Sequence, residues 1–214
     1  MEKTRQDHPQ TVATQIKDPN LVERRRRQIV DASVQLFIEK GFHKTTTRQI
    51  AQAAGFSIGT LYEYVASKED VLYLVCEAIH DEVEKGIGEV SSQAKKGREA
   101  LAAVIAEFFH ICHRMSNFIL LIYQETHALP GQWRRKVLAN EIRINELILD
   151  ALKRIAASGE LRRLDEKDLE LMAHNISVMG HMWTFRRWSL SQRFTIEEYI
   201  ARQTAIILGL AGAA

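Results

Sequence analysis

Two pairs of residues in this chain have a spacing that could hold metal ions. Glu77 and His80 are three residues apart, and so are Glu107 and His110. In helical bundles that bind two irons, a glutamate and a histidine at this spacing project from one helix toward the bundle axis. The pattern is short and arises easily in helical, glutamate-rich sequence. A di-iron carboxylate enzyme is therefore an alternative hypothesis, and metal-free protein that still performs its function would exclude it.

Other common catalytic signatures are missing. The sequence has no Gly-x-Ser-x-Gly elbow, no glycine-rich phosphate loop and no Cys-x-x-Cys pair. Its two cysteines, Cys76 and Cys112, have no metal-ligand spacing, and buried free thiols are favoured over a disulfide between them. We therefore expect a protein that is not an enzyme, with no catalytic residue, no cofactor and no metal ion.

A different chemistry is indicated by GFSIGTLYEYVASKED at residues 55–70. Small residues let a backbone come close to the edges of DNA bases, and tyrosine hydroxyls can bond phosphates. Lys68 adds a cation at a helix start, where backbone N–H groups also favour phosphate. We expect Tyr62 and Tyr64 to be exposed for this purpose, and core packing of a small bundle is the alternative. The small residues are Ser57, Gly59 and Thr60.

The charge of the chain is unevenly distributed. Residues 1–68 carry 11 Lys and Arg against 7 Asp and Glu, whereas residues 69–214 carry 18 against 20. A basic N-terminal third on a mildly acidic body is typical of a polyanion-binding head. The run of four arginines at 24–27 is equally compatible with a solvated helix face.

The elements that must position these residues are short helices with their own start and stop signals. A helix, a tight turn containing glycine and a second short helix form a helix-turn-helix unit. In DNA-binding proteins the second helix of that unit enters the major groove. The signals are, in chain order, Asn20 with Glu23, Gly41, Thr46 with Gln49, Gly55, and Ser57.

From residue 68 onward the pattern lengthens. We expect helices near 68–88, 97–115, 117–128, 132–158, 166–188 and 195–211, with Ser67 and Thr195 as caps. Three prolines and no alternating strand pattern predict an all-α fold of about nine helices. The last two helices are apolar on more than one face, which favours a homodimer through a four-helix interface.

We expect a flexible arm over residues 1–20, a DNA-binding domain over 21–82 and a second helical domain over 83–214. The first twenty residues are polar and lack the apolar core of a secretory signal. The longest apolar run, AIILGLAGAA, is too short to cross a bilayer. The expected location is cytoplasmic, without a membrane partner.

The order of caps, glycines and aromatic residues over 24–72 resembles the TetR/AcrR family of bacterial transcription repressors. The resemblance implies an operator in double-stranded DNA as partner, with Lys68 on a phosphate. Two residues depart from the common family pattern: Ile58 replaces a polar residue, which suggests a methyl contact with thymine, and Val65 replaces phenylalanine. The implied DNA-binding residues are Thr47, Arg48, Ser57, Ile58, Gly59, Thr60, Tyr62, Tyr64 and Lys68.

The same resemblance implies that the C-terminal domain dimerises and holds a small-molecule effector, whose binding pivots the connecting helix and separates the two reading heads. Aromatic residues on apolar helix faces are more often core than pocket. The candidate effector-binding residues are Phe109, His113, Phe118, Tyr123, Glu125, Asn140, Trp183 and Arg187, with Phe108 and Asn175 beside them.

The segments LIYQETHALP and HMWTFRRWSLSQRFTIEEYIARQTAIILGL look like the subgroup that governs fatty-acid degradation and responds to acyl-CoA thioesters. An acyl chain needs an apolar tunnel, and a coenzyme A head needs cations at its mouth. Aromatic acids, drugs or no ligand stay open as alternatives, as do an activator or an architectural DNA-binding protein. The available cations are Arg134, Arg135, Arg162, Arg163, Arg186 and Arg187.

Overall fold

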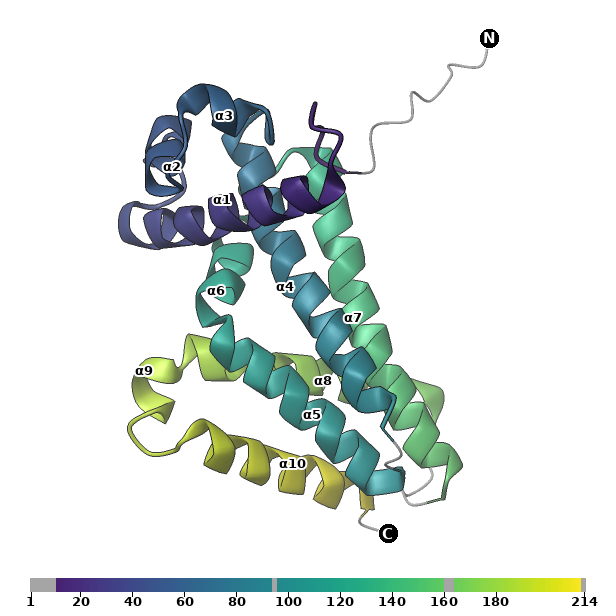
Figure 1. The fold of residues 1–214 in the computed structure, drawn as a ribbon. Helices are drawn as coiled ribbons and strands as arrows, with labels where there is room; N and C mark the ends of the chain where they lie inside the picture. The colour runs from purple at the N-terminus through teal and green to yellow at the C-terminus, as the bar shows by residue number, and fades with distance from the viewer. Residues whose placement is uncertain (1–10, 94–95, 160–163, 213–214) are drawn as a thin grey trace.

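The computed structural model describes residues 11–93, 96–159 and 164–212, and in this part of the chain every regular element is a helix (Figure 1). The all-α prediction is confirmed. The elements are α1 (Pro19–Lys40), α2 (Thr47–Ala53), α3 (Ile58–Tyr62), α4 (Lys68–Ser91), α5 (Gly97–Arg114), α6 (Ser116–Glu125), the 3-10 helix η1 (Thr126–Ala128), α7 (Gly131–Ala157), α8 (Glu166–Phe185), α9 (Arg187–Leu190) and α10 (Ile196–Gly212).

The molecule has a small head and a longer helical body (Figure 1). Helices α1 to α3 form the head at one end. Helices α4 and α7 run side by side from the head into the body, where α5 packs against α4, α7, α8 and α10. Helix α6 lies beneath the head and contacts both α1 and α4. Movement of the body can therefore reach the head through two elements, α4 and α6.

The start of α1 differs from the sequence-based prediction. Asp18, rather than Asn20, is the N-cap, and its carboxylate accepts the backbone N–H groups of Asn20 and Leu21 at 3.0 and 3.3 Å. Pro19 then occupies the first helical position, where its missing N–H costs nothing and its fixed φ suits a helix. The capping box expected between Asn20 and Glu23 is therefore wrong.

The other start signals are confirmed. Thr46 and Gln49 form the predicted capping box of α2, and Ser57 accepts the N–H of Thr60 to cap α3. Gly41 and Gly55 have φ values of 82° and 75°, in the region that glycine adopts without steric cost. Short-range hydrogen bonds thus define both ends of the helix-turn-helix unit.

The core of the head comes from one face of each helix. Ile29 of α1, Ile50 of α2 and Leu61 of α3 are all fully buried. Val65, which stands where the family pattern has phenylalanine, is also buried. Three short helices with so little apolar area each depend on this shared core for stability.

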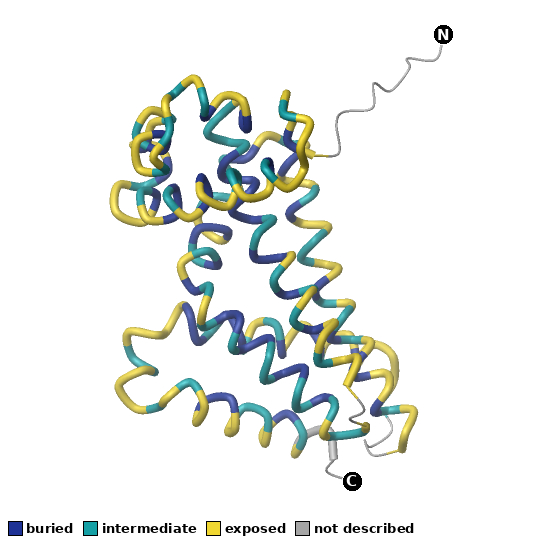
Figure 2. The backbone as a smooth tube through the Cα atoms, viewed as in Figure 1, coloured by how far each residue is buried: buried dark blue, intermediate teal, exposed yellow. Residues whose placement is uncertain are grey.

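Helix α4 is continuous from Lys68 to Ser91 and crosses the domain boundary expected at 82/83 without a break. Its buried face begins in the head at Val71 and continues into the body at Val83 and Ile87 (Figure 2). The division into 21–82 and 83–214 stays a proposal about function.

Two glycines let the body helices approach one another closely. A Cβ atom on Gly180 of α8 would lie 2.7 Å from Phe108 Cε1 and 3.1 Å from Cys112 Sγ. One on Gly86 of α4 would lie 2.8 Å from Ile111 Cδ1. Helix α5 is thus wedged tightly between α4 and α8, and both cysteines are buried and free. The body is packed without space for a ligand along these contacts.

Helices α8 and α10 each leave apolar side chains uncovered. Leu171, Val178 and Phe185 lie seven residues apart along α8 and are 62%, 61% and 38% exposed, and Ile206 of α10 is 51% exposed. Residues at this spacing share one helix face. Among the described residues, no helix is long and apolar enough to cross a membrane.

Candidate nucleic-acid interface and effector site

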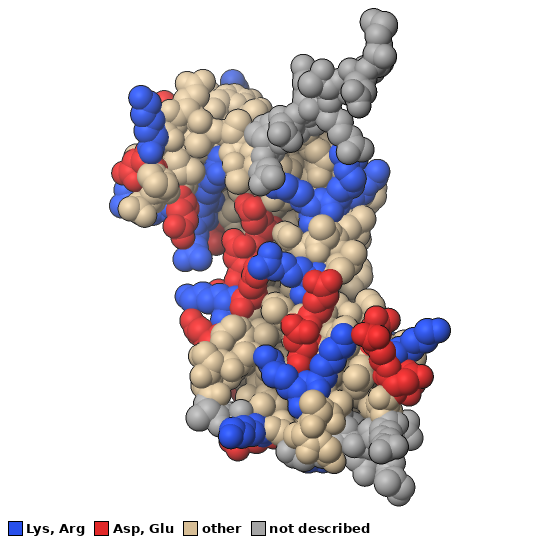
Figure 3. All heavy atoms as spheres, turned by 90° about the vertical axis from the view of Figure 1, so that its right-hand side faces the viewer, with Lys and Arg blue, Asp and Glu red and all other residues tan. Residues whose placement is uncertain are grey.

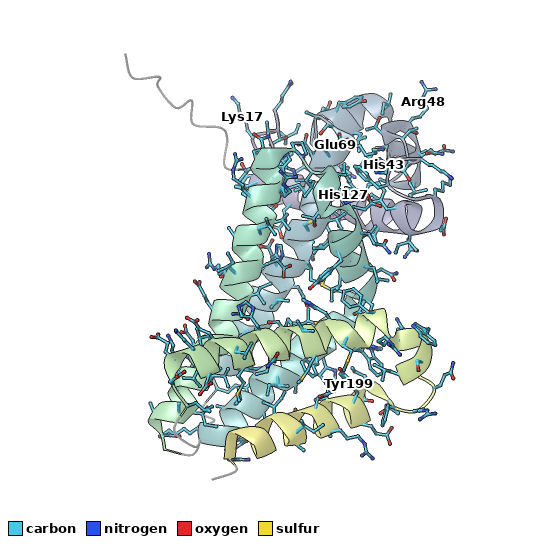
Figure 4. All side chains as sticks on the ribbon, turned by 180° about the vertical axis from the view of Figure 1, so that it is seen from behind. Lys17, His43, Arg48, Glu69, His127 and Tyr199 are labelled. Carbon is cyan, nitrogen blue, oxygen red and sulfur yellow. The ribbon has the colours of Figure 1, made fainter. Side chains whose placement is uncertain are left out.

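The outer surface of α2 and α3 presents polar groups with few internal partners. Arg48 is exposed at the outer edge of the head (Figure 4), and Tyr62 is 50% exposed. The hydroxyls of Thr47 and Tyr62 lie 3.1 Å apart, so α2 holds the tyrosine of α3 in place. These side chains are oriented outward and can meet a polyanion without refolding.

The first turn of α3 is small and accessible. Ser57 is exposed, and its hydroxyl lies 3.0 Å from that of Thr60. Gly59 is exposed, and an added Cβ would meet only Ser57 Oγ, at an ordinary 3.7 Å. Ile58, in contrast, is half-buried and packs on the core. The predicted methyl contact with thymine thus rests on the exposed part of its side chain.

The structure corrects the expectation for Tyr64. Its side chain is only 4% exposed, because α3 ends at Tyr62 and the following turn rotates residue 64 into the head core. Its carbonyl oxygen accepts two bonds from the guanidinium of Arg26, at 3.2 and 3.0 Å. Tyr64 is therefore a core residue that positions α3, and the core-packing alternative holds for it.

Lys68 also has internal partners. Its ammonium donates to the carbonyl oxygens of Phe42, His43 and Thr45 at 2.7, 3.3 and 3.0 Å, and it lies 4.4 Å from the centre of the Phe42 ring. These bonds occupy all three of its donors. In this structure Lys68 ties α4 to the loop between α1 and α2, and only the N-terminal backbone of α4 stays available for a phosphate.

Part of the expected flexible arm contacts the head. Val12 is buried, the Thr14 hydroxyl donates to the carbonyl of Glu63 at 2.7 Å, and Arg26 donates to the carbonyl of Val12 at 2.6 Å. Burial lowers the pKa of Arg26, although the charges of Glu77 and Asp70 oppose that shift. Lys17 is exposed beside this segment (Figure 4).

Charge is unevenly distributed on the surface. On the face drawn in Figure 3, Lys and Arg side chains gather at the head end beside the N-terminal segment, whereas basic and acidic side chains mix along the body. The fields of mixed charges cancel at a distance, whereas a group of charges of one sign keeps its field. The single-signed basic group of this face thus lies beside the N-terminal segment, whereas the rest of the head carries both signs.

The interior of the body holds a chain of polar groups among apolar side chains. His80 Nε2 of α4 lies 2.9 Å from Glu141 Oε1 of α7, and its Nδ1 lies 3.3 Å from the Asn140 amide nitrogen. The Tyr123 hydroxyl of α6 lies 2.9 Å from Nδ1 of His181 on α8. All but Asn140 line one interior cavity with Ile79, Val83, Phe108, Cys112, Ile119, Ile122 and Ile144.

This cavity is almost closed. Its volume is about 10 Å³, which is room for roughly one water molecule. A drug-sized ligand needs several hundred Å³. The described conformation is therefore that of a body whose interior polar groups bond one another.

Electrostatics in this cluster favour the ionised form of Glu141 and the neutral form of His181. Burial alone would raise the pKa of Glu141, but the hydrogen bond and charge of His80 and the charge of His181 lower it overall. Burial lowers the pKa of His181, although the charge of Glu141 opposes the shift. A cluster of this kind can hydrogen-bond a polar ligand group, but it costs free energy to leave any of its members without a hydrogen bond.

The eight candidate effector residues do not meet in one pocket. Tyr123 reaches the interior cavity, while Asn140 lines an adjoining groove of about 250 Å³ between α4 and α7. Phe109 is core, packed 5.8 Å from the Tyr199 ring, and Phe118 lines a groove of about 1020 Å³ beneath α1. In this conformation these side chains lie on different helix faces, and their common role in effector binding stays a prediction.

Three other candidates do form a group. His113 Nδ1 accepts the indole N–H of Trp183 at 2.8 Å, and both line a groove of about 430 Å³ with Arg187. This groove opens between the end of α8 and the start of α10. Burial lowers the pKa of His113, with the charge of Arg187 acting in the same direction. Glu125 belongs to none of these places and lies at the head–body junction near His43.

The arginines proposed for a coenzyme A head are also dispersed. Arg134 and Arg135 are exposed near the start of α7, and Arg186 lies 5.3 Å from the Trp188 ring. Arg162 and Arg163 lie outside the described residues. Of this group, Arg187 is the one that borders a groove together with other candidate residues.

Three residues of the interior cluster, His80, Glu141 and His181, are absent from the predicted effector-binding set. Glu141 follows Val137 and precedes Ile144 on the buried stripe of α7, and His80 lies between Cys76 and Val83 on that of α4. An ionisable residue on an otherwise apolar stripe is the signal that would have identified both.

The two Glu-x-x-His pairs do not build a di-iron site. Glu77 accepts the hydroxyl of Tyr73 at 2.8 Å, His80 pairs with Glu141, and Glu107 accepts from Arg114 at 3.2 Å. Within the described ranges these pairs contribute to no cluster of three or more metal-ligating side chains.

Comparisons with known proteins agree with this geometry. The family model of bacterial regulatory proteins, tetR family, matches residues 29–73. The transcriptional regulator HbdR of Aromatoleum sp. (strain CIB) is 29% identical over 191 residues, which are 89% of this chain and 82% of that one. The fatty acid metabolism regulator protein of Bacillus subtilis (strain 168) is 33% identical over 138 residues, 63% of this chain and 70% of that one.

A solved structure shares the fold. That of AibR in complex with isovaleryl coenzyme A and operator DNA has a TM-score of 0.70 and 21% sequence identity, and the match covers 85% of this chain and 97% of that one. At this identity the likeness concerns the fold.

Proposed function

The chain belongs to the TetR family of bacterial regulatory proteins, and from that premise we propose that it is a ligand-responsive repressor that binds a palindromic operator as a homodimer. The relatives are transcriptional regulators rather than enzymes. A regulator that acts on the chromosome of a bacterium works in the cytoplasm, and that is the location proposed for this protein.

The exposed face of α2 and α3 is the proposed DNA interface. Arg48 and Tyr62 are outward-facing, and Gly59 leaves the backbone of α3 uncovered. Arginine and tyrosine suit phosphate and base edges, and a bare backbone suits close approach in the major groove. Tyr64 and Lys68 contribute by holding α3 and α4 in position. The proposed contact residues are Thr47, Arg48, Ser57, Ile58, Gly59, Thr60 and Tyr62.

The proposed dimer interface is the uncovered apolar face of α8 and α10. Leu171, Val178 and Ile206 are each more than half exposed, and exposed apolar side chains of this size favour an interface with another chain. Two copies that bury these faces against each other form a four-helix interface and place two heads on one side of DNA.

The observation that carries the regulatory proposal is the path of α4. One end of this helix holds the head loop through Lys68, and its middle contributes His80 to the interior pair with Glu141. A ligand that enters the cavity must separate this pair, and α4 then moves together with the head. Such a ligand shifts the equilibrium by its differential affinity for the two states.

For the effector we propose an acyl-CoA. The apolar side chains around the cavity suit an acyl chain, and the polar cluster suits a thioester carbonyl. Two similar proteins support this class, since one is named as a fatty acid metabolism regulator and the other was solved with isovaleryl coenzyme A. The closed cavity requires that the helices part for the chain to enter.

The test uses full-length protein and an operator selected from random DNA duplexes. Acyl-CoAs of increasing chain length are titrated into the complex, and release is followed by mobility shift. Release that is maximal at one chain length supports the proposal, and no release at any length refutes the acyl-CoA effector. A single protected palindrome supports a repressor dimer, whereas protection without sequence preference would favour an architectural protein.

A further inference from the structure

Three side chains that bind metals well meet at the junction of head and body. His43 lies in the loop between α1 and α2, Glu125 is the last residue of α6, and His127 lies in η1. Their nearest ligand atoms all lie within 4.8 Å of one another, and His43 Nε2 is 3.8 Å from Glu125 Oε2. Figure 4 shows His43 and His127 close together where the head meets α6. The group therefore joins two parts of the fold.

The carboxylate of Glu125 is incompletely hydrogen-bonded. Its side chain is 16% exposed, and its Oε2 is buried without a hydrogen-bond partner. A buried carboxylate oxygen without a hydrogen bond has lost its hydration without compensation, which destabilises the folded state. The two imidazoles beside it are exposed, and that of His43 packs edge-on against the Phe42 ring at 5.4 Å. A cation bound between the three side chains would satisfy this oxygen.

The donor set selects among cations. Two imidazoles and one carboxylate suit Zn²⁺ and leave a fourth position for water, whereas Mg²⁺ and Ca²⁺ prefer oxygen ligands alone. Zinc holds its ligands at about 2.0–2.2 Å, which brings them roughly 3.3–3.6 Å apart. Rotation of the exposed histidines closes the present spacing. We propose that His43, Glu125 and His127 form a Zn²⁺ site that joins the DNA-binding head to the body.

The location gives this site a regulatory consequence. The carbonyl of His43 already accepts a bond from Lys68, so the same loop is tied to α4. Zinc would add a second tie from that loop to α6 and η1. A head that is bonded to α6 and η1 through a metal ion pivots less readily than one that only packs against α6. Zinc therefore restrains the motion by which an effector acts on the head.

The test measures zinc binding by tag-free, full-length protein from which metal has been removed. Competition with a chromophoric chelator should show one zinc ion per chain. The variants His43→Ala and His127→Ala should lose this binding, while His110→Ala, a histidine outside the triad, should retain it. Absence of zinc binding, or equal binding by all variants, would overturn the proposal.

A second variant separates ligand loss from misfolding. Glu125→Gln keeps the side-chain volume, so its melting temperature in chelator should match or exceed that of the natural protein. Zinc should raise the melting temperature of the natural protein, because an ion that binds only the folded state stabilises it. That rise should be lost in Glu125→Gln, and an undiminished rise would also overturn the proposal. Neither measurement depends on DNA binding or on an effector.

Discussion

Gly59 offers a sharp test of the DNA interface, because the folded protein itself does not require a glycine there. Its φ is not in the positive region, and an added Cβ would meet only Ser57 Oγ at 3.7 Å. Within a helix, alanine is more favourable than glycine by about 0.5–1 kcal/mol. Gly59→Ala should therefore stabilise the protein and raise its melting temperature by roughly 1–4 °C.

The same substitution should weaken operator binding. If the backbone of α3 approaches base edges closely, a new methyl group overpacks that contact at a cost of about 1–3 kcal/mol. That cost corresponds to roughly a 5- to 150-fold loss of affinity. Because no Lys or Arg changes, the dependence of affinity on salt should stay that of the natural protein.

The matched control is Gly88→Ala in α4. Gly88 is exposed, and an added Cβ there would meet nothing within 4 Å. It should gain similar stability without any loss of operator affinity. Urea unfolding and fluorescence anisotropy on the selected operator provide the two measurements. Equal operator affinity in both variants would refute the close approach of α3 to DNA.

Other predictions concern Tyr62, Lys68 and His181. Tyr62→Phe removes an exposed hydroxyl, so the free energy of unfolding should change by less than about 0.5 kcal/mol. Operator affinity measured by fluorescence anisotropy should fall. Unchanged operator affinity would exclude a role for the hydroxyl. Lys68→Met removes charge-assisted hydrogen bonds to three carbonyl groups, so it should lower the free energy of unfolding by about 1.5–3 kcal/mol or more, measured with urea. An unchanged free energy of unfolding would show that these bonds are not formed in solution. Because burial lowers the pKa of His181, the unfolded chain binds a proton more readily, and stability should fall as pH drops below about 6.5. His181→Asn should make that fall between pH 7 and pH 5 shallower, and an identical pH profile would contradict the buried neutral state.

The helix boundaries that the sequence predicts correctly are those set by local hydrogen bonds. Each of these caps bonds a residue three positions away, so the local sequence is enough to predict where the helix begins. The caps are Thr46 with Gln49, Ser57, and Ser67 with Asp70. The start of α1 was misplaced because Asp18 followed by Pro19 competes with Asn20 two residues later. The choice between these two candidate N-caps depends on how the segment before α1 packs.

At the candidate site, contacts between distant parts of the chain decide what the sequence pattern leaves open. The ammonium of Lys68 is bonded to carbonyl groups 23 to 26 residues earlier, and its predicted contact with a phosphate stays a prediction. Tyr64 was expected to be exposed, yet it is buried in a turn whose carbonyl is held by Arg26. A sequence pattern shows which residues can bind a polyanion, but not which of them the fold has already engaged.

The closed interior of the body has a consequence for the affinity of any effector that binds inside it. If the proposed effector binds in this cavity of about 10 Å³, next to the His80–Glu141 pair, it binds an opened state that differs from the described one. The apparent dissociation constant is the intrinsic one divided by the fraction of molecules in that opened state. Under the proposed mechanism, the close packing of Gly180 against Phe108 therefore raises the ligand concentration needed for a response, and a looser core would lower it.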